Sequence, residues 1–319
     1  MKRRHIFQMG VLSLFGMGVL LSMVAFDPPG LHRKQELLSL SVILRGADSA
    51  SWPARQGMEQ AAVDLGAELR FLALDRPNHA GEQSSLLARE VEGGADGIIL
   101  VPADTEALSD DVRRAAAETT VVTIESDMSA SGAAACISAD NAALGEALGR
   151  AAINGVPLGG TVLLLDSVPG SSGMAQRLSQ AARILEENGR RAEALGIPDA
   201  HDLGGFLSER YRTDPPDAVV AFDSETLESA ARLAREFEKP PLLYGMGGTN
   251  VVVSGLERGE IMAIASQNEF AAGYLAVEAA AQAARDAPQQ AVEPLPFLIS
   301  RQENMYDSNH EKLLFPVTR

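Results

Sequence analysis

The residue types that most often carry out chemistry are few in this chain, or their spacing fits no familiar kind of site. The five histidines stand apart, and none pairs with another ligand at the spacing of a metal site. The single cysteine, Cys136, lies in the apolar stretch AAACIS, which favours a small buried core residue over a reactive thiol. Serines are frequent, but no G-x-S-x-G sequence marks a hydrolase nucleophile. We therefore expect no catalytic residue, no metal ion and no cofactor.

Two glycine-rich loops are the remaining signals of ligand chemistry. GMGGTN at 245–250 follows an apolar run but does not form G-x-G-x-x-G, and PGSSG at 169–173 lacks the lysine of a phosphate-binding loop. Both are typical of ordinary loops. The formal net charge of −16 argues against nucleic acid as a partner, because a phosphate-binding face needs clustered Lys and Arg.

The elements that must position any site alternate along the chain. Short apolar runs typical of strands are separated by stretches that carry apolar residues at helical spacing. Strands that are apolar on both faces, each followed by a helix, predict parallel sheets covered on both sides in a doubly wound α/β fold. The expected strands are 38–44, 69–74, 97–101, 120–124, 161–165, 218–222, 241–245 and 261–265.

The length of the chain indicates two lobes. About 280 residues follow the N-terminal segment, which is more than one hydrophobic core usually serves. The alternation also occurs in two sets, with a turn-rich junction near 126–140. In open parallel sheets, ligands bind at the loops that follow the carboxyl ends of the strands. The loops of interest are 45–53, 75–81, 102–105, 125–132, 166–173, 223–225, 246–250 and 266–268.

The N-terminal segment 1–30 indicates export. Lys2, Arg3 and Arg4 precede the uncharged run 6–26, which is about the length of ~20 residues that a transmembrane helix needs. The basic flank favours an N-terminus in the cytoplasm. Small residues suited to a cleavage site are poorly placed, so we favour an uncleaved transmembrane helix over a cleaved signal peptide.

Five stretches of the chain resemble a known family. GGADGIILVPADTEAL, VVTIESD, ISADNAALGEALGRA, DAVVAFDSETLESAARLA and GLERGEIMAIASQNEFAAG resemble, in this order, the type I periplasmic sugar-binding proteins, which share their fold with the ligand domain of LacI-type repressors. The resemblance covers residues 39–300. It implies two Rossmann-like lobes joined by hinge crossings, with the ligand closed between them. The implied lobes are 39–126 with 268–294, and 127–267 with 295–319.

The resemblance also implies a set of ligand-contacting residues at the ends of strands. An indole can cover the C–H face of a sugar, and carboxylates and guanidinium groups form charge-assisted hydrogen bonds with its hydroxyls. The alternatives are helix N-caps or solvated loop acids for the carboxylates, a surface charge for the arginine and a packing role for the tryptophan. The implied residues are Trp52, Glu125, Asp127, Arg177, Asp223 and Gln267.

Two further positions bear on the choice of ligand. The family often has an acid at the end of the strand 241–245, where this chain has Gly247, so the identity of the sugar is left open. Arg45 ends the first expected strand within reach of the cleft. It could bind an anionic ligand, and a surface or salt-bridged arginine is an equal alternative.

The sequence therefore predicts a binding protein and not an enzyme. We expect an exported, membrane-tethered solute-binding protein that captures a small ligand, a sugar or polyol, for an ABC permease. The alternatives are a ligand-sensing subunit for a membrane kinase or chemoreceptor and, less favoured, an exported α/β hydrolase. The expected location is the cell membrane, with the binding domain in the periplasm or outside the cell.

Overall fold

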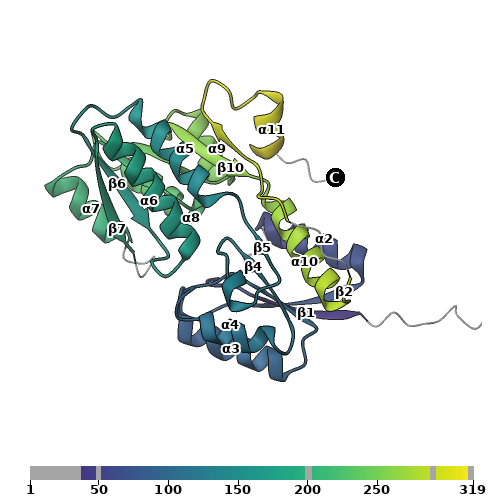
Figure 1. Ribbon diagram of the computed structural model, residues 1–319. Helices are drawn as coiled ribbons and strands as arrows, with labels where there is room; N and C mark the ends of the chain where they lie inside the picture. Colours follow the sequence, from purple (N-terminus) through teal and green to yellow (C-terminus); the bar gives the residue numbers. More distant parts are fainter. Residues whose placement is uncertain (1–36, 48–51, 198–202, 288–291, 315–319) are drawn as a thin grey trace, which may run out of the picture. The chain divides into compact units, whose positions relative to one another are not determined.

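The computed structural model describes residues 37–47, 52–197, 203–287 and 292–314 (Figure 1). The chain divides into a unit that ends at Leu37 and a unit from Leu38 to Arg319, and the fold described below is that of the second unit. The expected N-terminal transmembrane helix lies outside the described residues. Within the described ranges, no helix combines the length and the apolar character needed to cross a membrane.

The first sheet is parallel, and among the described residues it has five strands in the order β2-β1-β3-β4-β5. Alternate side chains of each strand face opposite sides, so that Ile99 packs towards α2 and α10 whereas Ile98 and Leu100 pack towards α3 and α4. Figure 1 shows these two pairs of helices on opposite faces of the sheet. Both faces are therefore buried, as the apolar strands predicted. The elements are β1 (Leu38–Ile43), α2 (Pro53–Leu65), β2 (Ala67–Leu72), α3 (Ala80–Glu92), β3 (Gly97–Leu100), α4 (Ser109–Ala116), β4 (Thr120–Ile124), η1 (Ser129–Ser131), β5 (Ala135–Ile137) and α10 (Glu269–Ala284).

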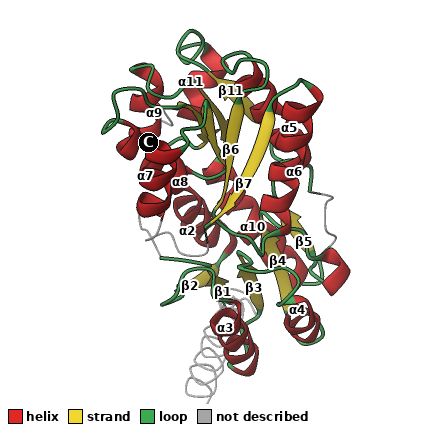
Figure 2. Ribbon diagram, turned by 90° about the vertical axis from the view of Figure 1, so that its left-hand side faces the viewer, coloured by secondary structure: helices red, strands yellow, loops and turns green. Residues whose placement is uncertain are grey.

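The second sheet has six described strands in the order β11-β10-β9-β8-β6-β7, and β11 is antiparallel to β10. Figure 2 shows α5 and α6 on one face and α7 and α8 on the other. Leu314, in the C-terminal segment, packs on the second of these faces. The elements are α5 (Asn141–Ile153), β6 (Thr161–Asp166), α6 (Ser172–Glu187), β7 (Arg191–Gly196), α7 (Leu203–Thr213), β8 (Ala218–Ala221), α8 (Ser224–Ala234), β9 (Leu242–Met246), α9 (Asn250–Glu257), β10 (Ala263–Gln267), β11 (Phe297–Ser300) and α11 (Ser308–Leu314).

The strands that the sequence did not predict are the edge strands β5, β7 and β11. β5 has three residues, and β7 carries the exposed side chains Arg191 and Glu193. An edge strand needs no apolar residues on both faces, so the pattern that identifies central strands is missing there. The doubly wound α/β fold with two parallel-sheet lobes is confirmed, with one antiparallel edge strand added to the second sheet.

The chain passes between the two sheets at 138–140, at Asn268 and along the segment that joins α10 to β11. A parallel bridge between Ala139 and Leu295 ties the first crossing to the third. The sequence placed the first exchange at 126, but β5 pairs with β4 in the first sheet. We therefore propose that the first lobe extends to Ile137.

Two glycines allow the backbones of α10 and α2 to pack in direct contact. A Cβ at Gly57 would lie 1.9 Å from the carbonyl oxygen of Phe270, and one at Gly273 would lie 1.8 Å from that of Ala54. Only glycine permits such an approach of two backbones. The close packing holds the first residues of the two helices at fixed positions, and these residues carry part of the candidate site.

Candidate ligand-binding site

Loops at the carboxyl ends of strands in both sheets make direct hydrogen bonds with one another. Asn78, after β2, donates from Nδ2 to the carbonyl oxygen of Ser167, after β6, over 3.0 Å. The hydroxyls of Ser126, after β4, and Ser171 are 2.8 Å apart. The backbone amide of Thr105, after β3, donates to the carbonyl oxygen of Gly170 over 2.9 Å. Three loops of the first sheet thus meet the loop that precedes α6.

Glu125 lies where these loops converge, and its backbone has a left-handed φ of 69°. That conformation is uncommon for a residue other than glycine and costs on the order of 1 kcal/mol. Its carbonyl oxygen accepts a 2.8 Å hydrogen bond from Nδ2 of Asn141, and a Cβ at Gly173 would lie 2.4 Å from that oxygen. The surrounding loops therefore fix the strained backbone and, with it, the position of the carboxylate.

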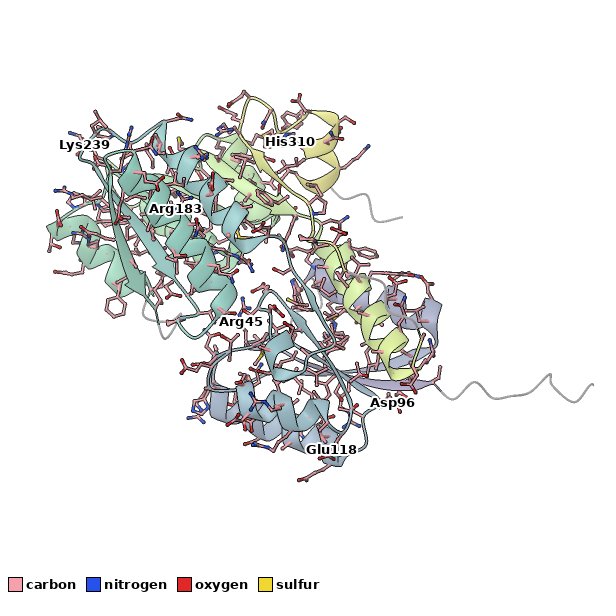
Figure 3. All side chains as sticks on the ribbon, in the orientation of Figure 1. Arg45, Asp96, Glu118, Arg183, Lys239 and His310 are labelled. Carbon is pink, nitrogen blue, oxygen red and sulfur yellow. The ribbon has the colours of Figure 1, made fainter. Side chains whose placement is uncertain are left out.

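Arg45 and Glu125 form an ion pair in the first lobe. The Nη1–Oε2 distance is 2.6 Å, and the two side chains are 19% and 27% exposed (Figure 3). Burial opposes the charge of Glu125, but the charges of Arg45 and Arg177 and the hydrogen bond from Arg45 prevail and lower its pKa. Burial likewise opposes the charge of Arg45, and Glu125 raises its pKa. Both side chains remain partly open to solvent and can therefore meet a ligand.

Arg177 is the buried arginine of the site. Its side chain lies on α6, where the residue is 3% exposed, and it donates from Nε to Oδ1 of Asn141 over 2.7 Å and from Nη1 to the carbonyl oxygen of Phe222 over 3.0 Å. Burial lowers its pKa, and the nearby charge of Glu125 opposes that effect. The surface charge considered as an alternative is therefore wrong. Arg177 links α5, α6 and the end of β8, and its contact with a ligand stays a prediction.

Asp223 caps helix α8. Its carboxylate accepts hydrogen bonds from the backbone amide and the hydroxyl of Thr226, both over 2.8 Å, and from the hydroxyl of Ser167 over 2.5 Å. This is the N-cap role considered as the alternative for this acid. The negative charge of Asp223 is also close enough to favour the charged forms of Arg45 and Arg177. The helix cap therefore lies near Arg45, Glu125 and Arg177.

Asp127 is placed differently from the other predicted acids. Its exposed carboxylate accepts hydrogen bonds from the backbone amide and the hydroxyl of Ser129, over 2.8 and 3.0 Å, at the start of η1. It also acts on the thiol of Cys136. These contacts describe a turn carboxylate, and we leave Asp127 out of the site proposed below.

Trp52 and Glu269 form a second pair in the first lobe. Trp52 is the residue before α2, and its half-buried ring packs on the core. Burial and the negative charge of Glu125 raise the pKa of Glu269 to about 7, although the nearby indole N–H of Trp52 favours the ionised form. Sequence reasoning missed Glu269, since its partner is distant in sequence. The one local signal was its position two residues after Gln267.

Gln267 ends β10, two residues before Glu269 in the chain. Its Oε1 atom is buried and finds no hydrogen-bond partner among the described residues. Buried polar atoms are almost always paired, so an unpaired one at a predicted ligand site is consistent with a group that receives its partner from a ligand.

Gly247 explains the missing family acid. Its φ is 138°, and a Cβ there would lie 2.5 Å from the hydroxyl oxygen of Ser224. Backbone conformation and space both favour glycine, so an aspartate cannot occupy this position without local rearrangement.

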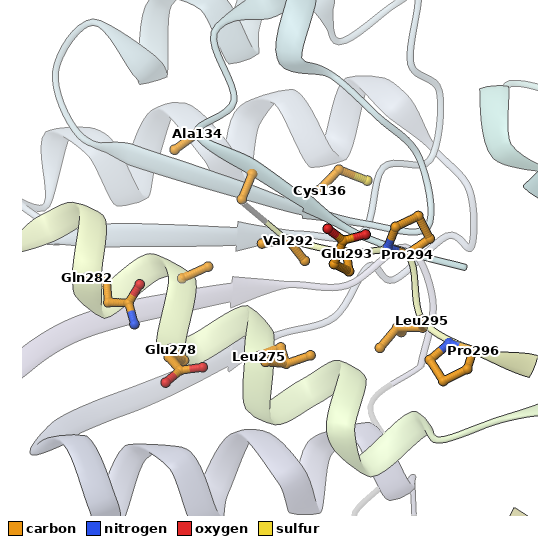
Figure 4. A pocket seen from close by; sticks show the side chains of 12 residues that line it. Ala134, Cys136, Leu275, Glu278, Gln282, Val292, Glu293, Pro294, Leu295 and Pro296 are labelled. Carbon is orange, nitrogen blue, oxygen red and sulfur yellow. The ribbon is translucent and has the colours of Figure 1, made fainter. Parts of the chain in front are cut away.

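A cavity of about 720 Å³ lies away from these residues, between β5, α10 and the third crossing (Figure 4). It contains none of the predicted site residues. Cys136 on its wall is half-buried and not fully buried as expected, and burial raises the pKa of its thiol to about 11. Such a thiol is protonated and unreactive at neutral pH.

Comparisons with known proteins agree with this architecture. A family model described as a periplasmic binding protein domain matches residues 40–288. The ribose import binding protein RbsB of Bacillus subtilis (strain 168) is 24% identical over 229 residues, which are 71% of this chain and 74% of that protein.

Two solved structures have similar folds. A carbohydrate transporter solute-binding protein from Agrobacterium radiobacter in complex with D-arabinose superposes with a TM-score of 0.80 at 19% identity, over 87% of this chain and 99% of that one. An ABC transporter solute-binding protein from Agrobacterium vitis with bound D-fucose gives 0.79 at 18% identity, over 87% and 100%. The resemblance seen in the sequence is confirmed, and the chain belongs to the periplasmic binding protein family.

Proposed function

We propose that this protein captures a sugar or a sugar-like polyol between its two lobes and performs no chemical step. The observation that carries the proposal is the charged group formed by Arg45, Glu125 and Arg177, which draws on strand ends and helices of both lobes. Trp52 with Glu269, Asp223 and Gln267 complete the proposed site. The family membership, which is that of binding proteins, supports capture without chemistry.

The chemistry of the group suits a polyhydroxylated ligand. Sugar hydroxyls both donate and accept hydrogen bonds, and Arg45 and Glu125 offer the charged partners that make such bonds strong. Trp52 offers an apolar face, and the unpaired Oε1 of Gln267 can accept from a hydroxyl. The names of the relatives point the same way, since they record ribose import, D-arabinose and D-fucose.

We further propose that the protein is exported, remains tethered by the uncleaved run 6–26 and delivers its ligand to an ABC permease. The binding domain would then lie outside the cytoplasm. The same tether would also suit a ligand-sensing subunit of a membrane kinase or chemoreceptor, which is the alternative function. Co-purification from membranes with a permease or with a sensor would decide between the two.

Thermal unfolding of the full chain in mild detergent tests ligand capture. D-ribose, D-arabinose, D-fucose and ribitol serve as probes. A probe at 100 times its dissociation constant should stabilise the protein by about 2.7 kcal/mol, which corresponds to a rise of several degrees in Tm. The shift should shrink in Glu125→Gln and persist in the control Glu186→Gln, whose side chain is exposed on α6. No shift with any sugar or polyol would contradict the proposal.

A further inference from the structure

Strand β2 forms an open edge of the first sheet (Figure 2). It pairs with β1 on one side, and no described strand pairs with it on the other. The carbonyl oxygen of Leu72 accepts from the amide of Leu44 over 2.8 Å, and that of Gly66 accepts from Leu38 over 3.1 Å. Because backbone groups alternate in direction along a strand, the groups at the odd-numbered positions of β2 point away from β1. These outward amides and carbonyls belong to Ala67, Leu69 and Phe71.

The side chains of β2 form two different rows. Leu69 and Phe71 are half-buried and pack on the core that α2 covers. Glu68 and Arg70 are exposed on the opposite face, and the side chain of Arg70 keeps 67% of its surface open although its Nη1 atom bonds to Glu90 over 3.2 Å. Among the described residues, Glu68 has no hydrogen bond or ion pair through its side chain. The edge therefore offers an apolar row on one face and two opposite charges on the other.

This row of residues is complementary to itself in one register. When two copies of a strand pair in antiparallel fashion about a two-fold axis, the residue on the axis faces its own copy. An axis at Glu68 or at Arg70 would place like charges opposite each other, which is unfavourable. An axis at Leu69 instead places Glu68 of each copy opposite Arg70 of the other. The remaining pairs in this register are Leu69 with Leu69 and Ala67 with Phe71.

The backbone directions agree with the same register. An axis at Leu69 makes the outward-pointing residues face one another, so that the two strands can exchange about six backbone hydrogen bonds. Glu68 and Arg70 then form the pairs without backbone hydrogen bonds, in which the side chains of an antiparallel ladder lie closest. Backbone and side chains thus favour one pairing, and the charges oppose a strand that does not match them.

The other described edge strands differ from β2. β5 and β11 carry no charged residue. On β7, Glu193 is already paired with Arg210 over 2.6 Å. The combination of outward backbone groups with an unpaired acid opposite a mostly exposed arginine therefore singles out β2 among these edges.

We propose that β2 is an interaction surface for a second copy of this chain, so that two first lobes join edge to edge in one continuous sheet. The inference goes beyond the proposed function and does not depend on it. The candidate ligand-binding residues follow the carboxyl ends of strands, whereas the pairing runs along the edge and uses none of them. A single short strand from each copy takes part, so we expect a weak dimer that depends on concentration.

Reversal of the two charges tests the register. Sedimentation equilibrium of the full chain in mild detergent, from about 5 to about 200 µM, should show the wild type approaching twice the 33.7 kDa of one chain. Glu68→Arg and Arg70→Glu each place like charges in both facing pairs, so each variant alone should dimerise about tenfold more weakly. An equal mixture of the two variants should dimerise as the wild type does, because every pair then joins opposite charges.

The control for this experiment is Glu186→Arg, which reverses an exposed charge on α6 and should leave the dimer unchanged. A wild type that stays monomeric over this range would overturn the inference. So would a dimer that both charge variants leave intact, since it would form through another part of the chain. Arg70→Glu also removes a partner of the buried Glu90, so its folding is checked by circular dichroism.

A disulfide on the axis tests the same pairing without a change of charge, and it decides the matter if Arg70→Glu does not fold. In an antiparallel hydrogen-bonded pair the Cα atoms are about 5.5 Å apart, a distance that a disulfide can span. In a Cys136→Ala background, Leu69→Cys should form a covalent dimer under mild oxidation. The control Leu158→Cys, at a site that is 79% exposed, should not. Cross-linking of Leu69→Cys no faster than of the control would refute the pairing.

Discussion

The two lobes hold the polar groups of the proposed site in different ways. In the second lobe, Arg177 donates to Asn141 and to the end of β8, and Asp223 accepts three hydrogen bonds from its own lobe. In the first lobe, Arg45 and Glu125 pair with each other but stay partly exposed, and Glu269 meets Trp52. The second lobe is thus a fixed scaffold, and the first lobe keeps bonding capacity for a ligand. Variants in the two lobes should separate stability from affinity.

The largest expected effect is that of Arg177→Ala on stability. Removal of the guanidinium leaves Oδ1 of Asn141 and the carbonyl oxygen of Phe222 buried without their donor, so we expect a loss of about 3 kcal/mol in the free energy of unfolding. Denaturant unfolding measures it. Arg183→Ala on the same helix removes an exposed arginine and should cost less than about 0.5 kcal/mol. Equal stabilities of the two variants would contradict the role of Arg177 as a fixed part of the second lobe.

Gly247→Asp restores the acid that the family often has and tests whether the scaffold tolerates it. The left-handed backbone and the 2.5 Å approach to Ser224 predict a loss of about 2 kcal/mol in stability and no gain in affinity for sugars. Thermal unfolding and calorimetry measure the two quantities. Tighter sugar binding at unchanged stability would contradict this prediction. It would show that the second lobe, like the first, can offer a polar group to a ligand.

Glu269→Gln should change the pH dependence of stability. The raised pKa of about 7 means that the folded protein binds a proton which the unfolded chain, with an ordinary glutamate, releases at lower pH. Stability from this group is therefore complete below about pH 4.5 and is lost as the pH rises through 7. At pH 8 the variant should be more stable than the wild type by roughly 1–2 kcal/mol, and at pH 4 this advantage should vanish. A constant difference across the range would contradict the assignment.

Arg45→Ala should have the smallest effect on stability of these variants, and it should lower affinity more than stability. A partly exposed ion pair contributes at most about 1 kcal/mol, so unfolding should change little, whereas affinity for a sugar should fall by about 1.5 kcal/mol. The pKa of Glu125 should rise, because Arg45 supplies the charge and the hydrogen bond that lower it. Carboxyl resonances followed by NMR across the acidic range measure that pKa. A larger loss of stability than of affinity would place Arg45 in the scaffold.

The alternation of apolar runs predicts the central strands and the two-lobed fold, because a strand that is buried on both faces is a continuous apolar run. The edge strands have no such run. In β7, for example, Arg191 and Glu193 face solvent. Among the proposed site residues, the sequence indicates Arg177 but gives no sign that it is buried, and its contact with a ligand stays a prediction. Burial depends on α5, which approaches where Gly145 has no side chain. Glu269 was missed because its partner, Trp52, is reached only through the packing of α10 on α2.

That packing also sets the order in which the protein can be completed. The face of the first sheet that carries Leu40, Val42 and Ile99 is covered by α2 and by α10, and α10 is made after the whole second sheet except β11. During synthesis this apolar face stays incompletely covered until residues 269–284 have left the ribosome. Contacts between residues that are far apart in the sequence slow folding, and until they form the apolar surface is exposed to aggregation. The first lobe can therefore complete its core only after every strand of the second sheet except β11 has been made.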